Sequence, residues 1–438
     1  MNQSLYENHL AVLISNLQLA LGCTEPIAAA FAAAKARAVL GQMPSRMTLD
    51  CSGNIIKNVN GVVVPNSNGM KGVDVAAVLG LVGGNADRQL EVLEDITDVH
   101  IEKTKELIAQ GFCTCRLVED VENLYIRVFL ETDDGHSAEV VMRNYHTNIT
   151  YIAKDGEVLL DNASAPEKAS KHAATGDPAL LNIKNILEFA ETVKLKDVSE
   201  VIERQISCNS ALSNEGLRHP WGVQMGSTLL ATCGDSLPVR ARAAAAAGSD
   251  ARMSGCTLPA VINSGSGNQG ITVTMPVVVY AQVLGVEHEK LIRALVISNL
   301  ISVHQKKYIG SLSAYCGAVS AATGAACGIA WMTDQPYQVI CDTIINSIAT
   351  SGGVVCDGAK PSCAAKISTA VEMALNALEL AKLGRVFQPG EGLVKNDVEE
   401  TIKSVGRMAK NGMKSTDVEI LNIMLERLDS PGNELDYD

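Results

Sequence analysis

Four cysteines carry the chemistry that this sequence most clearly suggests. Cys356 and Cys363 bracket the turn-rich segment C-D-G-A-K-P-S-C, and Cys316 lies forty residues before Cys356 in a Gly/Ala-rich stretch. Three thiolates on loops at helix ends can bind a [4Fe–4S] cluster and leave one iron open as a Lewis acid. The spacing is not C-x₂-C, so it indicates neither a ferredoxin nor a zinc ribbon. The competing interpretation is that these are small, buried, reduced cysteines.

The fourth cysteine, Cys23, belongs to the motif L-G-C-T-E-P ahead of an Ala-rich segment. Pro26 suits the first turn of a helix there, and Thr24 is its expected N-cap. Cys23 then lies at the N-terminus of this helix, where the partial positive charge favours a thiolate. We therefore expect a reactive thiolate at Cys23.

A Gly/Ser/Asn loop ahead of an apolar helix is a candidate anion site. Exposed N–H groups converge at such a position and the helix dipole adds to them, so the loop could bind a phosphate or a substrate carboxylate. A flexible turn is the alternative, but three glycines within residues 263–270, beside Asn and Ser, are more than a turn needs. The candidate residues are Asn263, Ser264, Gly265, Ser266, Gly267 and Asn268.

His304 is a lone candidate acid or base, ahead of Lys306 and Lys307. A solitary histidine is more often structural, so this assignment competes with a packing role. Either lysine could instead belong to an enzyme that uses pyridoxal phosphate, with the glycine-rich loop as its phosphate site. The sequence offers no defined lysine context for that alternative.

The composition is that of a globular protein with ample core. The chain has 438 residues, 47% of them hydrophobic and 4% aromatic, with a net charge of −13. No basic block stands out, which argues against nucleic acid as a partner. No apolar run reaches the length of a membrane span, and no signal peptide is evident. We expect a cytoplasmic protein and a homo-oligomer, with the twelve cysteines as free thiols or metal ligands.

The hydrophobic pattern changes along the chain. Alternating residues predict strands with an antiparallel sheet, at about 46–51, 61–64, 113–118, 124–131, 138–144 and 148–153. After residue 181 apolar helices dominate, at about 181–213, 219–247, 275–303, 317–331, 337–350, 363–384 and 396–427. We predict an α+β fold in three parts: helices in 1–45 that pack on the catalytic domain, an α+β domain with linker in 46–180, and an all-α catalytic domain in 181–438.

Several motifs together resemble the L-cysteine desulfidase family. They are L-G-C-T-E-P at 21–26, S-D-A-R-M-S-G-C-T-L-P at 249–259, N-S-G-S-G-N-Q-G-I-T-V-T-M-P-V at 263–277 and the spacing of the last three candidate cysteines. This is an oxygen-sensitive iron–sulfur family, which includes uncharacterised bacterial paralogues and is distantly related to the α chain of iron–sulfur L-serine dehydratase. The resemblance runs from Cys23 to the C-terminal helices.

The resemblance implies a function and roles for these residues. Cys316, Cys356 and Cys363 would bind a [4Fe–4S] cluster, and Cys23 would be a displaceable fourth ligand or a base, with His304 as a second base candidate. The 263–268 loop, with Thr24 and Glu25, would hold a small amino-acid substrate. The implied reaction is β-elimination of L-cysteine to sulfide, ammonia and pyruvate. L-Serine dehydration at the same cluster, or a non-catalytic ligand or redox sensor, are the alternatives.

Overall fold

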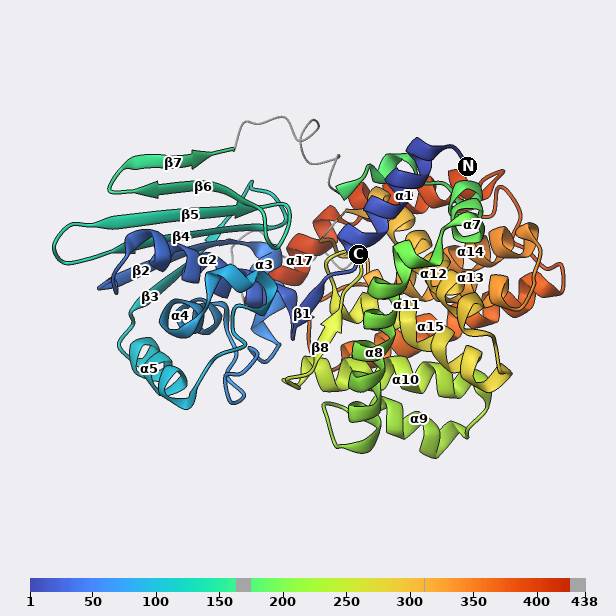
Figure 1. Ribbon diagram of the computed structural model, residues 1–438, viewed down its shortest axis with the longest axis horizontal. Coiled ribbons are helices and arrows are strands. Elements are labelled where there is room, and N and C mark those ends of the chain that lie inside the picture. Colours follow the sequence, from blue (N-terminus) through green and yellow to red (C-terminus); the bar gives the residue numbers. More distant parts are fainter. Residues whose placement is uncertain (163–174, 311, 426–438) are drawn as a thin grey trace, which may run out of the picture.

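Two modules with separate hydrophobic cores make up the structure. The computed structural model describes residues 1–162, 175–310 and 312–425. One module is built around a six-stranded sheet and the other mainly from helices, and they lie side by side (Figure 1). We call them the sheet module and the helical module. This confirms the α+β class.

The sheet has the order β3-β2-β4-β5-β6-β7. Its strands are β2 (Arg46–Ser52), β3 (Cys113–Val118), β4 (Tyr125–Glu131), β5 (Ser137–Arg143), β6 (Ile149–Lys154) and β7 (Glu157–Asp161). In β4, Ile126, Val128 and Leu130 are fully buried, because alternate residues of a strand face the same side.

Most of the sheet is antiparallel as predicted, but β2 and β3 pair in parallel. Parallel neighbours need a long crossover, and here the chain between them forms α3 to α5. The predicted strand at 61–64 forms only an isolated bridge between Val63 and Lys71. The strand β7 lies in residues 155–180, the part of the 46–180 domain that the sequence indicated as a linker.

Helices cover one face of this sheet. They are α2 (Thr24–Leu40), α3 (Gly53–Asn60), α4 (Val73–Gly83), the 3₁₀ turn η1 (Ala86–Glu91) and α5 (Asp98–Ala109). The Ala-rich α2 packs against α4 and the strands β4 to β6. At their crossing, a Cβ on Gly80 would lie 2.2 Å from the Ala30 carbonyl oxygen. The expectation that the helices of 1–45 pack on the catalytic domain is therefore wrong for α2, which is buried in the sheet module.

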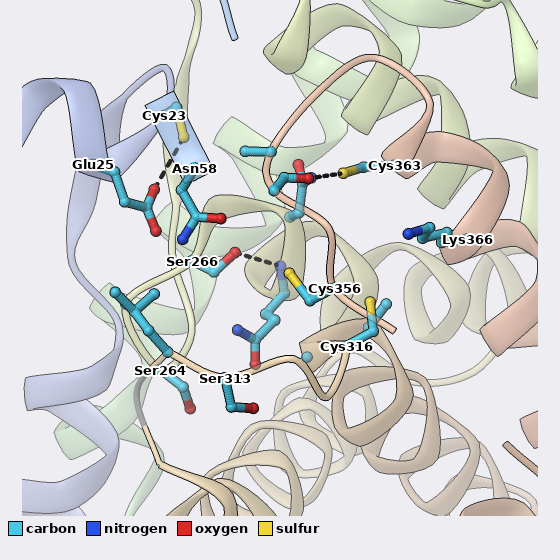
Figure 2. A pocket seen from close by; sticks show the side chains of 18 of the residues that line it. Cys23, Glu25, Asn58, Ser264, Ser266, Ser313, Cys316, Cys356, Cys363 and Lys366 are labelled. Carbon is cyan, nitrogen blue, oxygen red and sulfur yellow. Dashed lines mark hydrogen bonds between the residues drawn. The ribbon is translucent and has the colours of Figure 1, made fainter. Parts of the chain in front are cut away.

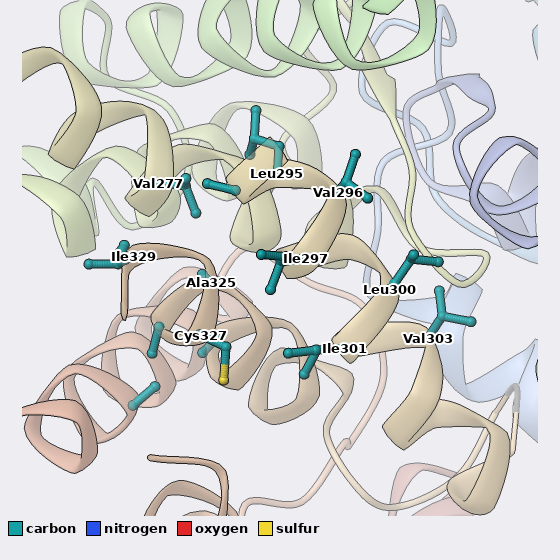
Figure 3. Close-up of a cluster of buried hydrophobic side chains, with 14 of the residues drawn as sticks. Val277, Leu295, Val296, Ile297, Leu300, Ile301, Val303, Ala325, Cys327 and Ile329 are labelled. Carbon is teal, nitrogen blue, oxygen red and sulfur yellow. The ribbon is translucent and has the colours of Figure 1, made fainter. Parts of the chain in front are cut away.

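The helical module contains α1 (Gln3–Asn16), η2 (Pro178–Leu180), α7 (Ile183–Thr192), α8 (Leu195–Arg218), α9 (Met225–Cys233), α10 (Leu237–Met253), α11 (Gly267–Leu284), α12 (His288–Ile309), α13 (Gly317–Met332), α14 (Tyr337–Ser351), α15 (Cys363–Lys382), α16 (Val398–Arg407), the short π-helix η3 (Met408–Gly412) and α17 (Lys414–Met424). Its core lies where α11, α12 and α13 meet (Figure 3). The predicted helices at 219–247 and 275–303 are each interrupted, the first after Cys233 and the second at Gly285.

Two contacts between segments distant in sequence join the modules. The strand β1 (Leu19–Leu21), between α1 and α2, pairs antiparallel with β8 (Pro259–Val261). The strand β8 is an exception to the predicted all-helical region. From the other end of the chain, α17 reaches back to pack on α3 (Figure 1). No helix in the described ranges is long and apolar enough to cross a membrane.

Candidate functional site

A cavity of about 110 Å³ lies at the junction of the two modules. On this measure a single water needs only ~10–15 Å³, so the cavity has room for a larger group. All four cysteines singled out from the sequence line it: Cys23, Cys316, Cys356 and Cys363. Cys23 lies on one side with Glu25, and the other three lie on the opposite side (Figure 2). The structure thus brings together side chains that are up to 340 residues apart, from Cys23 to Cys363.

Backbone hydrogen bonds hold the three distal cysteines in place. Tyr315 and Val355 form an antiparallel bridge. Cys316 N–H donates to the Val354 carbonyl at 3.0 Å, and Cys356 N–H donates to the Ala314 carbonyl at 2.6 Å. Cys316 is also the N-cap of α13, and Cys363 is the first residue of α15. The three thiols are therefore presented by helix starts and a paired loop, which leave little freedom to separate them.

Burial dominates the electrostatics around these thiols. Burial, followed by the charges of Cys356 and Cys363, raises the pKa of Cys316 to about 12. Burial also raises the pKa of Cys363. The amine of Lys306 faces the same cavity, where burial lowers its pKa to about 8 against the opposing effect of Cys356 and Cys316. Lys306 is only 7% exposed.

The donor set fits an iron–sulfur cluster, because three thiols and the buried amine of Lys306 line one cavity. Within the described part of the chain, no three His, Cys, Asp or Glu side chains converge closely enough for one ion. A [4Fe–4S] cluster binds each thiolate to a different iron, so its ligands stand further apart. Binding would deprotonate the three thiols, and the cluster's negative charge would offset the buried ammonium of Lys306.

The expected thiolate at Cys23 is wrong for the protein as described. Cys23, not Thr24, is the N-cap of α2. Burial and then the charge of Glu25 raise the pKa of Cys23 well above its ordinary value, although Arg252 acts in the opposite direction. The neutral thiol instead donates to Glu25 Oε2 at 3.0 Å. Desolvation outweighs the helix N-terminus here because the sulfur is only 2% exposed.

Glu25 is the ionised partner in this part of the site. Burial by itself raises its pKa, but His146 and Cys23 outweigh burial and hold the pKa at about 2. His146 Nε2 lies 3.7 Å from Glu25 Oε1 and forms no hydrogen bond with any described residue. His146 comes from the turn between β5 and β6, so the sheet module supplies a titratable side chain to the cavity.

The glycine-rich loop divides into residues that line the cavity and residues that hold the loop. Those that line it are Ser264, Gly265, Ser266 and Asn268. Asn263 lies behind them, fully buried, and donates to Asn299 Oδ1 at 2.9 Å. Gly265 has φ +80°, and its carbonyl accepts from Thr24 Oγ1 at 2.8 Å. Thr24 and Asn263 thus position the loop and do not line the cavity.

Arg252 is the most conspicuous unsatisfied side chain in the cavity. It is 2% exposed, and its Nη1 donates to Asn268 Oδ1 at 3.1 Å. Its Nε and Nη2 have no hydrogen-bond partner among the described residues. A Cβ on Gly267 would lie 2.2 Å from Arg252 Nε, so glycine at 267 is what allows the guanidinium this position. Two unpaired donors on a buried cation can bind a carboxylate.

His304 does not belong to the cavity. It is fully buried on α12, and its Nε2 is hydrogen-bonded to Glu399 Oε2 on α16 at 2.8 Å. Glu399 Oε1 in turn accepts from the Ile183 backbone N–H. Because His304 links three helices and lines no part of the cavity, the prediction that it acts as a base is wrong.

Sequence reasoning missed His146 and Arg252, and treated Lys306 only as an uncertain alternative. Arg252 lies in the motif S-D-A-R-M-S-G-C-T-L-P at 249–259, which was quoted for the family resemblance. Its place in that motif was the one sequence signal that could have identified it. In the structure the neighbouring Asp250 has another task, because its carboxylate accepts from the backbone of Val223 and Met225. His146 gave no local signal, since only the turn between β5 and β6 brings it to the cavity.

The cavity brings together three thiols, the buried amine of Lys306 and the buried guanidinium of Arg252. The sequence matches the serine dehydratase alpha chain family over residues 87–422, and the chain belongs to that family. It is accordingly a lyase-type enzyme, and its family is iron–sulfur dependent. The matched region includes the three distal cysteines and the glycine-rich loop. This confirms the relationship that the motifs indicated.

Full-length relatives carry the name UPF0597 protein. One from Lachnoclostridium phytofermentans is 48% identical over 96% of this chain and 100% of its own length. One from Finegoldia magna is also 48% identical, with 96% and 100% coverage. A third, from Treponema denticola, is 44% identical over 97% of this chain and 99% of its own length.

Proposed function

We propose that this protein is an iron–sulfur-dependent lyase that converts L-cysteine to sulfide, ammonia and pyruvate. One observation carries the proposal: the three distal cysteines, the unpaired guanidinium of Arg252 and the pair Glu25–His146 all line one cavity. The first group suits a [4Fe–4S] cluster, the second a substrate carboxylate and the third a proton transfer. A β-elimination from a small amino acid needs all three.

Cys316, Cys356 and Cys363 would hold the cluster through their Sγ atoms. When bound, a cluster with three protein ligands supplies an open iron that acts as a Lewis acid on the leaving group. Lys306 would lie beside the cluster and offset its charge. Lys366 would keep the loop in shape, because its Nζ donates to the Val355 carbonyl at 2.9 Å and pairs with Asp357.

Arg252 would bind the substrate carboxylate through its Nε and Nη2, the two donors without a partner. The N-terminus of α11 lies next to it, where Ser266 is the N-cap and where the helix dipole favours a negative charge. Asn268 holds the guanidinium at Nη1, which limits its rotation. Fixing the carboxylate in this way would orient the Cα–H and Cβ–S bonds of the substrate.

His146 would take the α-proton at Nε2, with Glu25 stabilising the imidazolium that forms. This differs from the prediction for Cys23, whose thiol is protonated and donates to Glu25. As the Cα–H electron pair forms the Cα=Cβ bond, the Cβ–S bond breaks and sulfide leaves as HS⁻. His146 would then return its proton to HS⁻ or to water. The 2-aminoacrylate product then takes up water and yields pyruvate and ammonium, which balances atoms and charge.

L-Serine is the second candidate substrate, and the family match favours it, since that family is named for serine dehydratase. Hydroxide would then replace sulfide as the leaving group, while the contacts to carboxylate and α-proton stay the same. The cavity residues do not separate these two substrates. Location in the cytoplasm and a homo-oligomeric state remain predictions.

The deciding experiment measures products from protein purified and reconstituted with iron and sulfide without oxygen. Sulfide and pyruvate in equal amounts from L-cysteine, lost after exposure to air, would support the desulfidase proposal. If only L-serine yields pyruvate, the assignment of the site holds and the substrate is L-serine. Bound iron without turnover of either amino acid would contradict the proposal and favour a ligand or redox sensor. The Cys316→Ala protein serves as the blank.

A further inference from the structure

The loop that carries two of the three distal cysteines is enclosed between the modules. This ligand loop, residues 352–362 with Cys363 directly after it, joins α14 to α15. On one side it is bonded to the 314–316 segment of the helical module, as described above. On the other side it lies against α3 of the sheet module. Its conformation therefore depends on how the two modules are held together.

The backbones of the ligand loop and of α3 approach each other closely. Gly358 has φ +95°, and a Cβ there would lie 2.4 Å from the Lys57 carbonyl oxygen. A Cβ on Gly61 would lie 3.1 Å from the Ala359 carbonyl oxygen. Glycine on both sides lets the two backbones approach, so α3 forms a wall of the ligand loop.

Lys57 makes the polar contact across this wall. Its side chain is 1% exposed, and its Nζ donates to the Cys356 carbonyl oxygen at 3.3 Å. A buried ammonium is stable only when it is paired, and the counter-charge comes from Asp417 on α17. Asp417 is itself held by Asn54, whose Nδ2 donates to Asp417 Oδ2 at 2.7 Å.

The helix α17 that supplies Asp417 is held by few contacts. It has eleven residues and none of them is buried, so it has little packing to stabilise it alone. Leu421 provides its apolar anchor, since a Cβ on Gly53 of α3 would lie 2.3 Å from Leu421 Cδ2. Val418 and Ile423 remain more than half exposed. Its docking thus rests largely on the contacts of Asp417 and Leu421 with α3.

We infer that Lys57 and Asp417 are positioning residues for the cluster: docking of α17 holds Lys57, and Lys57 holds the peptide of Cys356. The pair and α17 act together as a clamp on the ligand loop. The inference rests on the proposed function in that the ligand loop binds a cluster. It concerns cluster retention and assigns neither residue a part in the chemical step.

Iron retention tests the clamp directly. Wild type, Lys57→Met, Asp417→Asn and the double variant are reconstituted without oxygen, and iron per chain and loss of the visible cluster absorbance under excess chelator are measured. Lys414→Met is the matched control, since Lys414 is an exposed lysine on α17. We expect Lys57→Met to lose iron at least about tenfold faster, as fits the loss of a hydrogen bond from a charged donor. The control should match wild type.

The double variant separates a relay from two independent effects. If Asp417 acts through Lys57, the double variant loses iron at the rate of Lys57→Met; a clearly faster loss contradicts the relay. Equal retention in wild type and Lys57→Met overturns the clamp. Circular dichroism monitors the folding of each protein. If Lys57→Met does not fold, Asp417→Asn carries the test, because asparagine has nearly the same volume as aspartate. Iron loss at the wild-type rate in Asp417→Asn would then overturn the clamp.

The same data distinguish this inference from the proposed function. Wild-type protein that takes up no iron overturns both. Wild-type protein that retains iron but releases no product from L-cysteine or L-serine contradicts the proposed function alone. In that case the rate of iron loss from the variants still decides whether the clamp inference holds.

Discussion

The two walls of the cavity differ in what they contribute and in how they are held. The helical wall presents three cysteines, Arg252 and Lys306, and backbone hydrogen bonds or helix starts place the cysteines. The sheet-module wall presents Cys23, Glu25 and His146 from a helix start and a turn between strands. One wall is therefore suited to binding a cofactor and a carboxylate, and the other to moving a proton.

Beside the β1–β8 pairing, two side-chain hydrogen bonds join the walls near the cavity. Thr24 Oγ1 donates to the Gly265 carbonyl, and Asn123 Nδ2 donates to the Leu312 carbonyl at 2.6 Å. Side-chain contacts of this kind are weaker constraints than the backbone pairing that holds Cys316 and Cys356. We therefore expect the helical module to supply the cofactor ligands, with Lys57 of the sheet module holding one of them, and we expect proton transfer to depend on the relative position of the modules.

The largest effect is expected from the helical wall. Cys316→Ala, Cys356→Ala or Cys363→Ala should each abolish both bound cluster and turnover, because two thiolates cannot replace three. Iron analysis after anaerobic reconstitution measures the first and sulfide release the second. Cys233→Ala, at an exposed cysteine, is the control and should keep both. Full iron in any of the three ligand variants would contradict the assignment.

The sheet-module wall should affect turnover without affecting iron. His146→Ala should lower kcat on the order of 10²- to 10⁴-fold, the usual contribution of a general base, with iron content unchanged. Added imidazole should restore part of the rate, because it can occupy the space of the lost ring. His136→Ala, at an exposed histidine of the same sheet, should keep the rate. A His146→Ala enzyme with wild-type kcat would return the role of base to Cys23.

Arg252 should mark substrate binding on the helical wall. Arg252→Met removes two charge-assisted donors to the carboxylate, so kcat/KM should fall on the order of 100- to 1000-fold. Arg252→Lys should recover little, because an ammonium cannot reproduce the two donors of a guanidinium. Iron content separates this effect from cluster loss. Arg240→Met, an exposed position on the same helix, is the control, and equal losses in both variants would argue against a carboxylate site.

A smaller effect concerns stability and pH in protein without cluster. Burial lowers the pKa of Lys306 to about 8 from 10.5. Between these values the unfolded chain holds a proton that the folded chain has lost, so the free energy of unfolding rises with pH. At ~1.4 kcal/mol per pH unit, the contribution is about 3 kcal/mol. Below the lower value both states are protonated and the contribution stays constant.

Lys306→Met isolates this contribution. Burial also lowers the pKa of Lys307 to about 8, but Lys307 is present in both proteins and cancels in their difference. Denaturant unfolding at pH 7 and pH 10 should show wild type gaining on the variant as pH rises. With the cluster bound, its negative charge should reduce the gain. A difference that does not change with pH would show that the amine is not held in an unfavourable environment.

Local patterns in the sequence predicted much of the secondary structure. The alternation in Tyr125–Glu131 and the apolar run in Gly317–Met332 are intrinsic to those segments, so β4 and α13 were foreseen. The parallel pairing of β2 with β3 was not foreseen, because pairing depends on where the crossover places a strand. The packing of α2 on the sheet module was not foreseen either. Its Ala-rich surface allows close packing but does not indicate which element it packs against.

The sequence by itself determined the cysteine set, the glycine-rich loop and the family, because residue types and their spacing are written along the chain. Only the tertiary structure decided which side chains share the cavity. It removed His304, which is bonded to Glu399, and it added Arg252 and His146. It also decided that Cys23 is protonated, since the free energy of a thiolate depends on burial and on neighbouring charges. Such surroundings come from segments distant in sequence and have no local signature.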